Sequence, residues 1–310
     1  MTRHLLIDTD PGVDDALAIL IAHAHPDTRI AALTVTAGNV GLDHTLRNAL
    51  KLCEVAGIDA PVFPGAALPL VATPEDAAFV HGKDGFGDTG YTPAARNAET
   101  EHAALAMLRL SHQHPGELTF VMLGPLTNLA LALSLDPTLP QRVPRLVIMG
   151  GAVTGRGNTH IPVEFNTGFD PEAARIVFER WPQFELVDWE ATMRHGLPHA
   201  QCNQWFATDH PIARFYDAIS CNTRNWSIDR RGDEWHSADA LAMAYVVAPE
   251  AALETAERHV SVELGGQYTR GMTVVDWDQR TGAAANARIL LRYDRSHFES
   301  WVRRAVGMAA

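Results

Sequence analysis

The chain has 310 residues, of which 46% are hydrophobic, and its formal net charge is −12. That length and apolar content can bury the core of one undivided domain, residues 1–310. The sequence has no basic stripe that would bind nucleic acid and no apolar run long enough to cross a bilayer. Its three cysteines are scattered and its N-terminus does not resemble a signal peptide, which predicts a cytoplasmic protein without disulfides.

Short apolar segments alternate with helical patterns along most of the chain. Strands are expected at 4–8, 29–36, 118–123, 145–149 and 184–188. Helices are expected at 13–24 and 42–56, and from about 125, 171 and 237 onward. Asp170 followed by Pro171 predicts the start of one of them, with the aspartate as its cap and the proline at its first position. This alternation predicts an α/β fold with a mostly parallel, Rossmann-like sheet flanked by helices. The segment from about 195 to 236 breaks the pattern, and we expect it to form an inserted helical cap.

Four aspartates lie within eight residues where the first strand is expected to turn into the first helix. They are Asp8, Asp10, Asp14 and Asp15. Open α/β sheets bind ligands at the carboxyl ends of their strands. A single aspartate there would be an ordinary helix cap, but four carboxylates repel one another unless a cation or shared protons compensate. The cluster therefore predicts an all-oxygen site for a hard cation, Ca²⁺ or Mg²⁺.

Motifs spread over nearly the whole chain resemble, in the same order, those of the nucleoside hydrolase family. They are DTDPGVDDA (8–16), VTAGNV (35–40), VHGKDGFGD (80–88), GPLTNLA (124–130), MGG (149–151), GNTHIPVEFN (157–166), ADALAMAYVVAP (238–249) and GMTVVDW (271–277). The resemblance implies the nucleoside hydrolase fold and Ca²⁺-dependent hydrolysis of the N-glycosidic bond of a ribonucleoside or related N-riboside. It also implies a small-molecule substrate, a role in base salvage, and a homodimer or homotetramer.

The same resemblance implies a role for each matching residue. Calcium would be held by three carboxylates and one backbone carbonyl, those of Asp10, Asp15, Asp239 and Leu123. The general base that activates a water would be Asp14. The ribose would lie on Met149, with its hydroxyls bound by Asn39, Asn158, Glu164 and Asn166.

The predicted ribose segment has a simple local geometry. Glu164 and Asn166 flank Phe165, so an extended backbone would point both polar side chains in the same direction. The sequence therefore predicts an extended segment here that faces the sugar.

The chain differs from its relatives at a residue that would protonate the departing base or stack on it. Many family members carry a histidine immediately before the late aspartate, and some carry a tryptophan, but here that position is Ala238. Alanine can neither donate a proton nor stack on a base. The candidates for protonating the base are then His81 and His236, with further contacts from a cap loop that contains Arg224, Trp226 and Arg231, and from Trp235.

Two other functions stay open on the sequence alone. The segment Asp8-Thr9-Asp10 also fits the first motif of a haloacid-dehalogenase-like phosphatase, although its continuation and the later motifs do not. Because Ala238 is not an acid, the chain can also be a ribosyl-binding relative that hydrolyses natural nucleosides weakly or not at all.

Overall fold

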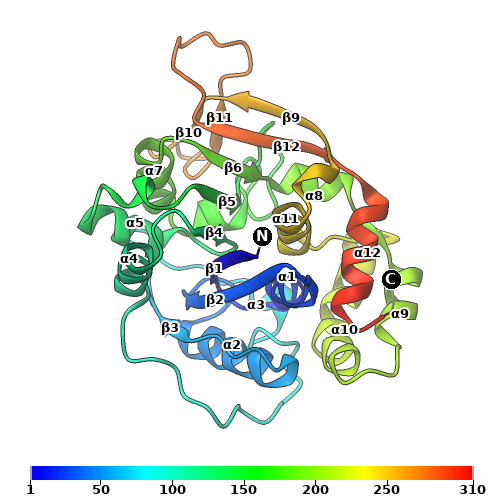
Figure 1. Ribbon diagram of the computed structural model, residues 1–310. Coiled ribbons are helices and arrows are strands. Elements are labelled where there is room, and N and C mark those ends of the chain that lie inside the picture. The colour runs from blue at the N-terminus through cyan, green and yellow to red at the C-terminus, as the bar shows by residue number, and fades with distance from the viewer. Residues whose placement is uncertain (1, 309–310) are drawn as a thin grey trace.

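A central eight-stranded sheet organises the computed structural model, which describes residues 2–308 (Figure 1). The strands run in the order β3 (Val62–Pro64), β2 (Thr28–Val35), β1 (Arg3–Thr9), β4 (Leu118–Met122), β5 (Arg145–Met149), β6 (Phe184–Val187), β12 (Ala287–Tyr293) and β9 (Ala252–Arg258). All neighbours are parallel except β9, which pairs antiparallel with β12. The prediction of a mostly parallel sheet is therefore confirmed.

Helices cover both faces of this sheet. Alternate residues of β1 point to opposite sides, so that Leu5 and Ile7 join one apolar core and Leu6 joins the other. The first core packs against α1 (Val13–Ala24), α2 (Leu42–Ala56), α11 (Ala238–Val247) and α12 (Arg295–Ala305), and the second against α4 (Ala103–Gln113), α5 (Thr127–Leu135) and α7 (Pro171–Arg180) (Figure 1). This two-sided burial explains why the strands read as nearly continuous apolar runs.

The remaining elements are short or lie at the edge of the sheet. Two small antiparallel pairs are β7 (Leu197–Pro198) with β8 (Glu234–Trp235), and β10 (Val260–Val262) with β11 (Thr273–Val275). The short helices are α3 (Ala78–His81), α6 (Phe165–Phe169) and α8 (Trp189–Arg194), with single 3-10 turns at Leu139–Gln141 and Pro249–Ala251. Within residues 2–308, no helix is both long and apolar enough to cross a membrane.

The segment predicted as a cap folds into two helices and both strands of one small sheet. They are β7, α9 (His199–Phe206), α10 (Pro211–Arg231) and β8. The expectation that Arg224, Trp226 and Arg231 lie in a loop is wrong, because α10 continues without a break to Arg231. Its buried face has helical spacing: the apolar Ala213, Tyr216 and Ile219 come first, and the polar Ser220, Thr223, Arg224 and Ser227 follow.

The start of α7 shows how local sequence and tertiary contacts combine. The side chain of Asp170 accepts a hydrogen bond from the Ala173 N–H at 3.0 Å, as predicted for a helix cap followed by proline. The other carboxylate oxygen accepts from the Thr127 hydroxyl at 2.7 Å and from the Leu70 N–H at 2.9 Å. Asp170 is fully buried, so it joins α7 to α5 and to the loop after β3.

We expect Asp170→Ala to lower the free energy of unfolding by about 3 kcal/mol, because it removes a cap and leaves two further donors without their partner. The control is Asp294→Ala at the exposed N-terminus of α12, where the side chain accepts from the His297 N–H and the Ser296 hydroxyl. That variant should lose about 1 kcal/mol. Urea unfolding of both variants measures the difference, and equal losses would show that the buried bonds of Asp170 add nothing.

Candidate active site

A pocket opens at the carboxyl ends of β1, β2, β4 and β5, where the sequence analysis places the site. Apart from the two cap arginines, twelve of the fourteen predicted site residues line it: Asp14, Asn39, His81, Leu123, Met149, Asn158, Glu164, Asn166, Trp226, Trp235, His236 and Asp239. The other two, Asp10 and Asp15, are buried beside these residues. The structure thus brings together side chains from segments that are far apart in the sequence.

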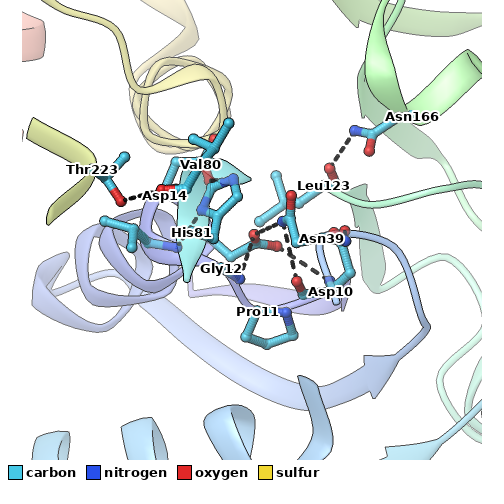
Figure 2. Close-up of polar contacts among 12 residues, drawn as sticks. Asp10, Pro11, Gly12, Asp14, Asn39, Val80, His81, Leu123, Asn166 and Thr223 are labelled. Atoms are coloured by element: carbon cyan, nitrogen blue, oxygen red, sulfur yellow. Dashed lines mark hydrogen bonds and ion pairs between the residues drawn. The ribbon is translucent and has the colours of Figure 1, made fainter. Parts of the chain in front are cut away.

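The turn between β1 and α1 is held by the carboxylate of Asp15. It accepts hydrogen bonds from the Thr9 hydroxyl at 2.5 Å, the Asp10 N–H at 3.2 Å and the Gly12 N–H at 3.0 Å. The Asn39 side-chain amide donates to the same carboxylate at 3.1 Å (Figure 2). These donors stabilise a carboxylate at the helix N-terminus, where the macrodipole also favours negative charge.

Asp10 is packed against backbone on two sides. Its carboxylate accepts from the Asn39 N–H at 2.6 Å. A Cβ atom would lie 2.1 Å from this carboxylate if added to Gly38, and 2.4 Å from it if added to Gly124. Both glycines are therefore required by the close approach of Asp10. Neither glycine is among the predicted site residues, although Gly38 lies in the motif VTAGNV and Gly124 in the motif GPLTNLA.

The fourth aspartate of the N-terminal cluster has a different place. Asp8 is fully buried, and one of its oxygens accepts from the Thr34 hydroxyl at 2.6 Å and from the Asn128 amide at 2.9 Å. It connects β1 to β2 and α5 and does not line the pocket. The phosphatase reading requires Asp8 as the nucleophile, and this position gives it no access to a substrate.

Buried carboxylates form the floor of the pocket. Asp14, Asp15 and Asp239 each offer an oxygen, and these oxygens lie within 4.8 Å of one another. Burial raises the pKa of Asp14 and of Asp15 to about 6, and repulsion from Asp14 adds to the shift of Asp15. Burial and the neighbouring aspartates also hold the pKa values of Asp10 and Asp239 well above the usual range.

This donor set fits a hard divalent cation. Its ligands would be oxygens only, and a bound cation would remove the repulsion that raises the carboxyl pKa values. One oxygen of Asp14 is buried without a hydrogen-bond partner among residues 2–308. The three carboxylates whose oxygens lie within 4.8 Å of one another are those of Asp14, Asp15 and Asp239, whereas the three predicted to bind the cation are those of Asp10, Asp15 and Asp239.

The side of the pocket that is predicted to bind ribose is built by a helix cap. The prediction of an extended backbone at residues 164–166 is wrong, because Phe165 begins α6. The carboxylate of Glu164 accepts from the Asn166 N–H at 2.9 Å and the Thr167 N–H at 3.2 Å, and this capping starts the helix. It also accepts from the Gly151 N–H at 2.9 Å. Both Glu164 and Asn166 nevertheless line the pocket.

Two asparagines fix the surrounding backbone. The Asn166 side-chain amide donates to the Leu123 carbonyl at 2.6 Å (Figure 2). It also donates to the Met149 carbonyl at 3.2 Å. The Asn158 side-chain carbonyl accepts from the Phe165 N–H at 2.8 Å. The carbonyl expected to bind the cation is thus held by a residue expected to bind the sugar.

His81 lies beside the aspartate cluster, where burial favours the neutral form of its ring. Its Nδ1 accepts from the Val13 N–H at 3.2 Å, and its Nε2 is 3.9 Å from the Asp14 carboxylate (Figure 2). Burial lowers the pKa of His81 to about 4. With Nδ1 accepting, the single proton of the neutral ring sits on Nε2 and points toward Asp14. The Thr223 hydroxyl of α10 donates to the Val80 carbonyl at 3.0 Å and so holds the short helix that carries His81.

The cap side of the pocket is mostly aromatic. Trp226, Trp235 and His236 line it together with Ala238. Trp235 is nearly fully buried, with its ring 6.0 Å from Phe206. Burial, and then the charge of Arg231, lower the pKa of His236.

The two arginines proposed for the cap side behave differently. Arg224 does not line the pocket, because it pairs with Asp217 at 2.5 Å and lies over the ring of Phe206. Arg231 does line it.

Known proteins resemble this chain over almost its full length. The sequence profile described as "Inosine-uridine preferring nucleoside hydrolase" matches residues 5–300. The "Non-specific ribonucleoside hydrolase RihC" of Salmonella typhimurium is 37% identical over 300 residues, which are 96% of each chain.

Solved structures agree with the sequence matches. A structure titled "Inosine-Guanosine Nucleoside Hydrolase (IG-NH)" superposes with a TM-score of 0.93 at 32% identity and covers 100% of both chains. The "Plant nucleoside hydrolase - PpNRh1 enzyme" superposes with a TM-score of 0.94 at 30% identity, over 99% of this chain and 100% of its own.

The fold and the sequence together leave the phosphatase reading without support. The chain belongs to the inosine-uridine preferring nucleoside hydrolase family of enzymes.

Proposed function

We propose that this nucleoside hydrolase cleaves the N-glycosidic bond of ribonucleosides, or of closely related N-ribosides, with a bound Ca²⁺. The observation that carries the proposal is the cluster of buried carboxylates at the floor of a pocket whose other wall presents polar side chains. The names of its relatives support nucleosides as the substrates, since they include a non-specific ribonucleoside hydrolase and an inosine-guanosine hydrolase.

The cation would be held by the carboxylates of Asp10, Asp15 and Asp239 and by the Leu123 carbonyl. Ca²⁺ suits this site because it accepts about six to eight oxygens in flexible geometry, which leaves positions for a water and for sugar hydroxyls. When bound, it supplies charge that lowers the pKa of a water and orients the ribose diol.

Asp14 is the residue that would take a proton from the attacking water. With a pKa of about 6 it is mostly ionised at neutral pH, and one of its oxygens has no partner among residues 2–308. Asn39, Asn158, Glu164 and Asn166 would bind the ribose hydroxyls above Met149. Water then bonds to C1′ as the C1′–N bond breaks, and the bonding electron pair leaves with the base.

His81 would position Asp14 rather than protonate the base. Its proton sits on Nε2 and faces the Asp14 carboxylate, and its low pKa leaves the ring neutral. A neutral imidazole is a weak acid, so help for the leaving base must come from elsewhere on the cap side. The homo-oligomeric state, the cytoplasmic location and the boundaries of the cap stay predictions.

We expect Asp14→Asn to fold and to retain its cation but to lose about a hundred- to ten-thousand-fold in kcat, the usual contribution of a general base. The matched control is Asp43→Asn, which changes the second residue of α2 as Asp14 is the second residue of α1, but on the exposed surface. Turnover of p-nitrophenyl riboside and elemental analysis measure both properties. Unchanged kcat would remove Asp14 from the role, and loss of the ion would make it a ligand.

We expect His81→Ala to lower kcat/KM for uridine and for p-nitrophenyl riboside by the same factor, about ten- to a hundredfold, because a misplaced base slows both reactions alike. His81→Gln, whose amide can replace the Nε2–H donor, should recover part of the loss. A loss confined to uridine would instead assign His81 to protonation of the base.

A further inference from the structure

Arg231 is the one lysine or arginine that lines the substrate pocket within residues 2–308. It is the last residue of α10. Its guanidinium carbon lies 4.5 Å from the ring centroid of Trp189 and 5.2 Å from that of Trp226. Two indoles that contact the face of a guanidinium leave the N–H groups at its edge free to donate.

Among residues 2–308, no carboxylate is in direct contact with the guanidinium of Arg231. Burial lowers the pKa of its guanidinium, and the only opposing influence is the negative charge of Asp14 at longer range, without a hydrogen bond. Arg231 is half-buried, and its N–H groups make no hydrogen bond with residues 2–308, so they are free to donate to a ligand in the pocket. The position of Arg231 therefore points to an electron-rich group of the substrate.

The pocket identifies which group that is. The aspartates of the β1–α1 turn and the residues predicted to bind the ribose come from the carboxyl ends of the sheet and the loops beyond them, whereas Arg231 and Trp226 come from α10 of the cap. Arg231 also contacts Trp189, whose ring lies 6.4 Å from that of His236. A nucleoside whose C1′ is close to Asp14 must direct its base toward the cap. As the C1′–N bond breaks, the base gains the bonding electron pair and becomes anionic.

We propose that Arg231 donates hydrogen bonds to the departing base and stabilises its negative charge. This inference rests on the proposed function. Oxygen of the water bonds to C1′, the water's proton passes to Asp14, and the base leaves with the electron pair as an anion that is protonated after release. A guanidinium keeps its proton in this step and acts by charge and hydrogen bonding alone.

The proposal also defines a substrate class. The base needs an acceptor atom that is bonded to the carbon beside the glycosidic nitrogen, such as the O2 carbonyl of uracil or N3 of a purine. Substrates whose leaving group is already stable as an anion gain little from Arg231.

The test compares two kinds of leaving group in Arg231→Ala. We expect kcat/KM for uridine and inosine to fall about a hundred- to a thousandfold, the size found for removing one donor from a developing anion. For p-nitrophenyl riboside we expect a fall of less than about threefold, since p-nitrophenolate needs little stabilisation. Added guanidinium chloride at millimolar concentration should restore part of the uridine activity of Arg231→Ala.

The matched control is Arg230→Ala. Arg230 precedes Arg231 in α10 and lies 5.0 Å from the same Trp226 ring, but it is exposed and does not line the pocket. This variant should act like the wild type on both substrates. Arg231→Lys, which keeps the charge but loses the fork of donors, should show an intermediate loss on uridine alone and serves if Arg231→Ala does not fold.

Equal losses on uridine and p-nitrophenyl riboside, or no loss on either, would overturn the proposal. Either result, in a wild-type protein that cleaves both, leaves the proposed function intact. A wild-type protein that cleaves no riboside would overturn the proposed function itself, so the two failures are distinguishable.

Discussion

The repulsion among buried carboxylates at the start of α1 is the constraint on which the site depends. Asp10, Asp14 and Asp15 come from one turn, and Asp239 arrives from the first turn of α11. Burial alone raises the pKa of each, and their proximity adds to the shift. Hydrogen bonds from Gly12, Thr9 and Asn39 offset only part of this cost, so a cation is the natural partner of the cluster.

The parallel sheet makes this arrangement possible. Its parallel strands present their carboxyl ends at one edge, so the turn after β1, the loop after β2 and the Leu123 carbonyl after β4 meet at one point. Packing of α11 against α1 then brings Asp239 to the same place. The loops that carry Asn158 and Glu164 and the cap helix α10 complete the pocket around the cluster, and α10 adds a half-buried cation, Arg231.

Local patterns predicted the elements that local interactions determine. The helices at 13–24 and 42–56 and the strand at 145–149 have the expected bounds, because apolar periodicity and strong boundary residues act within each segment. The cap of α7 by Asp170 was predicted for the same reason. The extended segment at 164–166 was wrong, because Glu164 caps α6 while it also bonds to Gly151, a contact from a different loop. The requirement for Gly38 and Gly124, and the isolation of Arg231 between two indoles, likewise depend on tertiary packing that no single segment encodes.

The most direct test of the account measures the thermal midpoint of chelator-treated protein, with and without added calcium, from about pH 5 to about pH 8. Without the ion, the carboxyl groups of Asp14 and Asp15, with pKa values of about 6, hold protons that the unfolded chain has released, and so does Asp239, whose pKa is raised by burial. Stability is therefore lost as pH rises through these raised pKa values. Calcium binds the ionised cluster and offsets that loss. We therefore predict that calcium raises the midpoint, and that the rise grows as pH increases. An identical midpoint with and without calcium at about pH 8 would contradict the claim that this cluster is built for a cation.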